Sequence, residues 1–161
     1  MTTTRAEHRT GDRRTLLTPD PFVVTGALVA LGCTFVGQFV DTPWRPGSPD
    51  WGFDFADGGG LGALAVLLAF VLVAAVVVSL VTAAARAAGP AAAGRRALWL
   101  AAIGVLSLGV FWTGVPAVVA GGAAGLATSA RRSGGRSMAA GIAVVLAVLT
   151  VAGAVYLAVA G

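Results

Sequence analysis

The chain has 161 residues, of which 57% are apolar and 11% charged, and its mean hydropathy is +0.88. A soluble domain carries roughly a quarter charged residues, and a disordered chain needs low hydrophobicity with high charge density. The composition excludes both classes and predicts a chain whose solvent is lipid. The eleven basic residues are all arginine and lie in short clusters without a continuous basic stripe, so nucleic acid is not an expected partner.

Residues 1–20 are polar, contain four arginines and have no apolar periodicity, which predicts a flexible basic tail in the cytoplasm. Residues 21–40 are uncharged and long enough to cross a hydrocarbon core of roughly 30 Å, so they are the first predicted transmembrane helix. A secretory signal peptide is an alternative, but no small-x-small cleavage site follows. A lipid-attachment sequence at Ala30–Cys33 is a second alternative, although its large and small residues stand in reversed order.

Residues 41–60 contain three prolines and end in a glycine run, which predicts an extracytoplasmic loop. Three aromatic residues alternate from Trp51 to Phe55, so an extended segment would place them on one side of the chain. Asp50, Asp54 and Asp57 allow a calcium site as an alternative. The spacing of an EF-hand is missing, so a solvated loop at the membrane interface is the favoured interpretation, and no metal is expected.

Residues 61–84 are almost pure leucine, valine and alanine and form the clearest predicted span, followed by a short basic connection from Arg86 to Arg96. Residues 97–130 are uncharged, but as one helix they would extend about 51 Å. Gly114 and Pro116 are typical of a helix end and a helix start. The sequence therefore predicts two short spans, 97–113 and 115–130, and a last span at 138–160.

Cytoplasmic loops collect arginine and lysine. Five spans with a cytoplasmic N-terminus leave only Arg45 outside the cell and predict an extracytoplasmic C-terminus. Four spans remain the alternative if residues 114–130 do not cross fully. Tryptophan and tyrosine prefer the membrane–water interface, and five such residues are predicted interfacial anchors: Trp44, Trp51, Trp99, Trp112 and Tyr156. The predicted fold is an all-α membrane bundle, with residues 21–161 as one transmembrane domain.

The predicted spans contain no aspartate, glutamate, lysine, arginine or histidine, and this argues against an ion-coupled transporter. Cys33 has no histidine or second cysteine near it, so no catalytic, cofactor or metal site is expected. Small residues at helical spacing allow close helix packing. The candidates are Ala117, Gly121, Gly125 and Ser129 in one helix and Ala139, Ala143 and Ala147 in the last.

The segment WTGVPAVVAGGAAGLATSARRSGGRSMAAGIAVV, within residues 97–160, resembles small glycine- and alanine-rich multi-pass membrane proteins of actinobacteria. The resemblance is compositional and implies no activity. We expect a non-enzymatic structural or accessory protein of a bacterial plasma membrane, with a passive channel or small transporter subunit as the alternative. The expected partners are the bilayer, anionic lipid headgroups bound by cytoplasmic arginines, and another membrane protein or a second copy of the chain.

Overall fold

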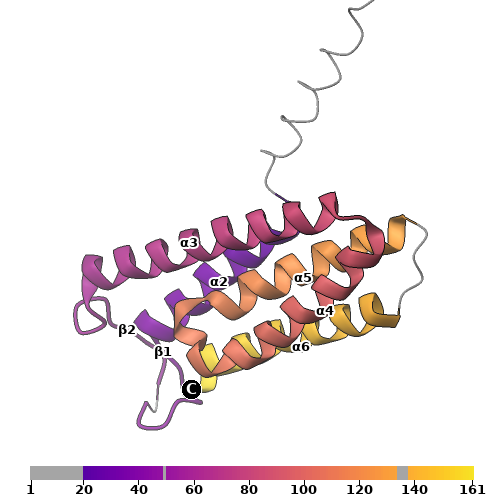
Figure 1. Ribbon diagram of the computed structural model, residues 1–161. Coiled ribbons are helices and arrows are strands. Elements are labelled where there is room, and N and C mark those ends of the chain that lie inside the picture. The colour runs from indigo at the N-terminus through magenta and orange to yellow at the C-terminus, as the bar shows by residue number, and fades with distance from the viewer. Residues whose placement is uncertain (1–19, 49, 134–137) are drawn as a thin grey trace, which may run out of the picture.

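The computed structural model describes residues 20–48, 50–133 and 138–161, so residues 1–19 of the predicted tail and 134–136 of the predicted last basic turn lie outside the described residues. The described chain is helical (Figure 1). Its elements are α2 (Pro21–Phe39), β1 (Val40–Asp41), β2 (Gly52–Phe53), α3 (Gly60–Ala87), α4 (Pro90–Leu106), the 3-10 helix η1 (Ser107–Thr113), α5 (Val115–Arg132) and α6 (Met138–Ala160). The prediction of an all-α membrane bundle is confirmed.

Helix α5 lies in the middle of the bundle, and α2, α3, α4 and α6 lie around it (Figure 1). Four segments are long and apolar enough to cross a membrane, namely α2, α3, α6 and α4 together with η1. The central helix is not among them because it is rich in glycine and alanine and ends in two arginines. Most of its residues are buried. A helix enclosed by other helices faces protein and not lipid, so it does not need large apolar side chains.

The predicted break between the third and fourth spans is confirmed at Gly114. This residue has φ +72° and is followed by Pro116 in the first turn of α5. A Cβ at Gly114 would lie 2.9 Å from a methyl group of Val71 and 3.0 Å from the Cβ of Ala30. Both the left-handed backbone and the space therefore require glycine at this turn.

The basic connection between the second and third spans is shorter than predicted. Helix α3 continues to Ala87 and α4 begins at Pro90, seven residues before the predicted start. Proline at the first helical position loses no hydrogen bond, because that N–H has no partner within a helix. Arg95 and Arg96 are exposed, so the helix can carry them on its surface. The predicted span 97–113 therefore lies within a longer helical segment, Pro90–Thr113.

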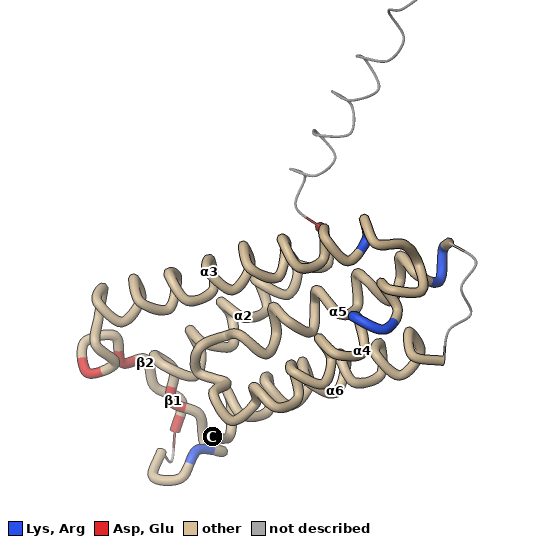
Figure 2. Tube along the Cα trace, viewed as in Figure 1, with Lys and Arg blue, Asp and Glu red and all other residues tan. Residues whose placement is uncertain are grey.

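Charged residues gather at the two ends of the bundle (Figure 2). Arg86, Arg95 and Arg96 lie where α3 meets α4, and Arg131 and Arg132 end α5; we call this the basic end. Residues 40–59, with most of the aspartates, lie at the other end, which we call the acidic end. This separation follows from helices that run alternately in opposite directions.

The loop at the acidic end is packed on the end of α2. Strand β1 pairs antiparallel with β2, with Val40 opposite Phe53. The rings of Phe53 and Phe55 lie 6.1 and 5.1 Å from those of Phe35 and Phe39, centroid to centroid. Part of the loop therefore forms an aromatic cluster with α2, in which Phe53 is still 65% exposed. The expectation of a solvated loop at the membrane interface stays a prediction.

The same loop satisfies the last carbonyl groups of α6. The hydroxyl of Thr42 donates to the carbonyl of Val159, and the Arg45 guanidinium donates to the carbonyl of Ala158 at 3.0 Å. The last carbonyls of a helix lack partners within it and form the negative end of its dipole. Arg45, the one arginine expected on the side opposite to the others, therefore caps α6.

Candidate functional site

A buried ion pair joins Asp20 to Arg86. Asp20 precedes α2, and its Oδ1 accepts a hydrogen bond from the N–H of Phe22 at 2.9 Å, as an N-cap does. Its Oδ2 pairs with the guanidinium of Arg86 in the last turn of α3. The Asp20 side chain is 5% exposed and that of Arg86 36%. One carboxylate therefore begins α2 and fixes it to α3.

Gly125 of α5 makes room for this carboxylate. A Cβ at Gly125 would lie 2.5 Å from Oδ2 of Asp20 and 3.2 Å from the Cβ of Phe22. Gly125 precedes Arg132, the end of α5, by seven residues, or about 10 Å along the helix axis. The pair thus lies at the basic end, about two turns before the last residue of α5. Because a buried carboxylate is costly unless it is paired, Arg86 is needed to keep it charged there.

Helices α2 and α5 cross at Gly26 and Gly121. A Cβ on Gly26 would lie 2.6 Å from the carbonyl oxygen of Ala117, and one on Gly121 would overlap the carbonyl oxygen of Phe22. The two backbones are in direct contact, which small residues alone allow. The predicted packing residues Ala117, Gly121 and Gly125 therefore lie on the face that meets α2. Ser129, the fourth, donates its hydroxyl to the carbonyl of Gly125 at 2.8 Å.

The small-residue face of α6 is displaced by one position from the predicted one at its start. Ala143 and Ala147 are buried, but Ala139 is half-buried and its neighbour Ala140 is fully buried. The same face continues to Thr150, whose methyl group is 3.4 Å from the position of a Cβ on Gly104 of α4. A spacing of four residues drifts around a helix of 3.6 residues per turn. The face that begins at Ala140 has the spacings three, four and three.

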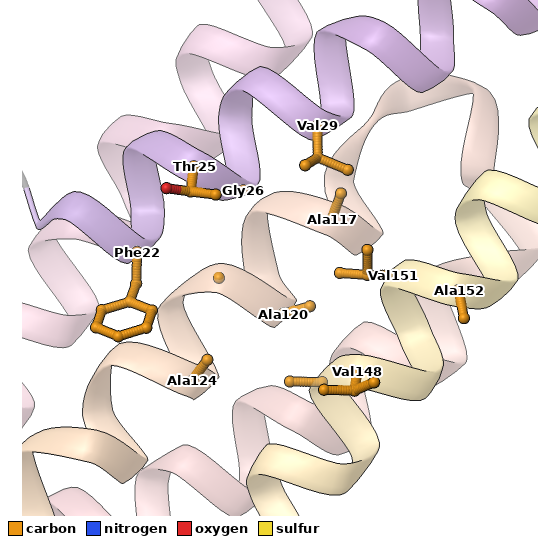
Figure 3. A pocket seen from close by; sticks show the side chains of 12 residues that line it. Phe22, Thr25, Gly26, Val29, Ala117, Ala120, Ala124, Val148, Val151 and Ala152 are labelled. Carbon is orange, nitrogen blue, oxygen red and sulfur yellow. The ribbon is translucent and has the colours of Figure 1, made fainter.

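A groove of about 380 Å³ lies between α2 and α6, with α5 as its floor (Figure 3). We call it the lateral groove. Ala117, Ala120 and Ala124 form the floor, while Phe22 and Val148 stand on the α2 and α6 sides. The groove exists because the floor residues are small and because α2 and α6 stand apart along this part of α5.

The five predicted interfacial anchors are all exposed. Their exposed fractions are 62% for Trp44, 64% for Trp51, 68% for Trp99, 54% for Trp112 and 69% for Tyr156. The rings of Trp44 and Trp51 contact each other edge to face at 5.4 Å in the loop at the acidic end. Trp99 lies one turn beyond Arg96 on α4. Their place at a membrane interface stays a prediction.

The threonine hydroxyls of α2, α3 and α6 donate to the backbone of their own helix. Thr34 donates to the carbonyl of Ala30 and Thr150 to that of Leu146, both at 2.8 Å. Within the described residues, no group of three or more histidine, cysteine, aspartate or glutamate side chains could hold a metal ion. Oδ1 of Asp54, one of the candidate calcium ligands, accepts a hydrogen bond from the N–H of Asp57 at 2.9 Å.

Asp20 is the residue that sequence reasoning missed, because it was assigned to the polar tail. A signal for it exists: an aspartate followed by Pro21 and an apolar run is typical of an N-cap with proline at the first helical position. Its pairing with Arg86 could not be read from the sequence, since another helix supplies that residue. No family model, curated protein or solved structure matches the chain. Function must therefore be argued from the geometry.

Proposed function

We propose that the chain is a structural or accessory integral protein of a bacterial plasma membrane, without enzymatic activity. The observation that carries this proposal is the filled interior of the bundle. Helix α5 occupies the centre, and Ala117, Val118, Ala123, Leu126 and Ala127 are at most 1% exposed. The surrounding helices instead present large apolar side chains outward, such as Leu72 and Val76 of α3. Such a bundle has no open passage inside. The surface available for binding is the outer one, which contacts lipid and other membrane proteins.

The passive channel is the weaker alternative. A polar pore needs hydroxyl or carbonyl groups aligned along a passage. In the described bundle, the hydroxyls of Thr34, Thr82 and Thr150 donate to carbonyls three or four residues earlier in their own helices. The space between the outer helices is occupied by α5. These contacts favour packing over conduction.

Reconstitution tests the structural role against the channel. We expect liposomes that contain the pure protein to be no more permeable to protons, potassium ions or glycerol than protein-free liposomes. We also expect the tagged chain, extracted from native membranes in mild detergent, to co-purify at reproducible stoichiometry with another membrane protein or a second copy. Solute flux above the protein-free background, or recovery of the monomer alone, would contradict the proposal.

We propose further that the basic end faces the cytoplasm and that all five helices cross the bilayer. The support is the arginine cluster at one end of the bundle. Cytoplasmic loops of membrane proteins are enriched in arginine, so this end is expected in the cytoplasm. The acidic end, whose Arg45 is engaged with α6, would then face outward.

Cysteine labelling tests this orientation, because the chain has a single native cysteine that Cys33→Ala removes. Ala56 is exposed in the loop at the acidic end, and Ser133 follows α5 at the basic end. Each of them is replaced by cysteine in turn. We expect a membrane-impermeant maleimide to label Ala56→Cys and Gly161→Cys on intact cells, and Ser133→Cys only after permeabilisation. The reverse pattern would overturn the orientation, and labelling of Gly161→Cys only from inside would overturn the five crossings.

A further inference from the structure

The lateral groove is open on the outer surface of the bundle and its lining is hydrocarbon. Phe22 and Val148, on its two sides, are 38% and 63% exposed. Thr25 is the one residue with a polar side chain that lines the groove, and its hydroxyl donates to the carbonyl of Pro21 at 2.8 Å. The groove therefore offers no free hydrogen-bonding group, and an occupant must be apolar along its length.

The floor of the groove leads to an arginine at the basic end. Arg131 follows Ala124 by seven residues, so it lies on the same face of α5 about two turns further on. On α6, Gly141 precedes Val148 by the same interval. The guanidinium Nη2 of Arg131 lies 3.1 Å from the position of a Cβ on Gly141. The arginine head therefore lies against α6, in line with the groove.

Among the described residues, neither α2 nor an acidic side chain covers this stretch. Helix α2 begins at Pro21, beside Gly125, so it stops short of the last turn of α5. Arg131 is exposed. The ion pairs found among residues 20–48, 50–133 and 138–161 join Arg45 to Asp41 and Arg86 to Asp20. The charge of Arg131 is therefore open to an external anion.

We propose that the lateral groove binds one acyl chain of an anionic phospholipid whose phosphate contacts Arg131. Arginine matches a phosphate with two parallel hydrogen bonds. The apolar groove would hold the acyl chain, and Arg131, which lies in line with the groove, would bind the anionic headgroup. This inference goes beyond the proposed structural role and requires only that the bundle be embedded in lipid.

The charge at the end of the groove distinguishes a lipid from a protein helix. A phospholipid joins an apolar chain to an anionic head, which matches an apolar groove with Arg131 in line with it. The described α-helices of this protein contain no aspartate or glutamate. A helix of a second copy in the groove would therefore bring no anion to Arg131, and a second copy is the less suitable occupant.

Native mass spectrometry of the purified full chain in detergent tests the proposal. We expect one tightly bound phosphatidylglycerol, weaker binding of phosphatidylcholine with the same acyl chains, and no binding of glycerol 3-phosphate. Arg131→Gln should lower the preference for phosphatidylglycerol about fivefold, since one arginine near a lipid surface contributes about 1 kcal/mol. Ala124→Phe, which fills the floor, should lower the affinity for both lipids at least tenfold.

Two matched variants serve as controls, because neither Ala69 of α3 nor Arg96 of α4 lines the groove and both are exposed. Ala69→Phe and Arg96→Gln should leave lipid binding unchanged. Thermal unfolding identifies variants that fail to fold, and Ala152→Phe at the rim then replaces Ala124→Phe.

Equal affinity of the wild type for both lipids, or no effect of Arg131→Gln, would overturn the proposal. A dimer that Ala124→Phe dissociates would also overturn it, by assigning the groove to a second copy. A detergent micelle does not separate two compartments, so these results do not depend on the orientation of the protein in the membrane.

Discussion

Arg86→Met is expected to lower the free energy of unfolding of the bundle by about 3 kcal/mol, because it leaves the carboxylate of Asp20 buried without its partner. Asp20 is 5% exposed and is confined against Gly125, so it cannot turn toward water. It must stay charged in a poorly solvating site or take up a proton, and both are costly. Unfolding in detergent mixtures, followed by circular dichroism, measures the loss.

Asp20→Asn is expected to cost less, about 1 kcal/mol, because a buried ion pair loses most when the charge left behind cannot reach water. Arg86 is 36% exposed and has a long side chain that can turn its guanidinium toward water at the basic end once the carboxylate is gone. Asparagine keeps an oxygen that can accept from the N–H of Phe22, so the start of α2 is preserved.

The double variant decides whether the two residues act as a pair. Asp20→Asn combined with Arg86→Met should be as stable as Asp20→Asn alone, to within about 0.5 kcal/mol, since no buried charge remains. Arg96→Met, which removes an exposed arginine at the same end, should leave stability unchanged. Additive losses in the double variant would contradict the pairing, and equal losses in the two single variants would contradict the difference derived from their exposure.

The outer helices could be predicted from sequence because their own residues determine them. Long uncharged runs are stable only as helices in hydrocarbon, and this gave the positions of α2, α3 and α6 to within a few residues at each end. The hairpin between η1 and α5 was also predictable, since Gly114 and Pro116 act locally on the backbone. In each case the signal lies within the element itself.

The central place of α5 and the role of Asp20 depend on residues far away in the chain. The run from Val115 to Ala130 is only weakly apolar, which suggested a partial crossing. The same composition is explained once four helices surround it. Asp20 reads as part of a polar tail until Arg86 and Gly125 are placed beside it. Hydropathy describes contact with lipid, and it cannot identify contacts between helices.

Gly121→Ala, which adds one methyl group, is expected to lower the free energy of unfolding by about 3 kcal/mol or more. Among the described glycines, we expect this substitution by alanine to be the most damaging. Its Cβ would overlap the carbonyl oxygen of Phe22 and lie 3.1 Å from the Cα of Gly26. Both are backbone atoms in the adjoining helix, so relief requires α2 to move away from α5 as a whole. That movement would also separate Asp20 from Gly125. Thermal unfolding in detergent measures the effect.

Two other glycines separate this steric effect from helix propensity, because alanine is intrinsically the better helix former by about 1 kcal/mol. Gly32, exposed on α2, has no atom within 4 Å of its Cβ position, so Gly32→Ala should raise stability by up to that amount. Gly122→Ala should fall between the two, since it meets a methyl group of Val78, a side chain that can shift. The free energy of unfolding is therefore expected to be lowest for Gly121→Ala, higher for Gly122→Ala and highest for Gly32→Ala. A stable Gly121→Ala protein would mean that α2 and α5 do not meet backbone to backbone, and the fixed position of Asp20 would lose its basis.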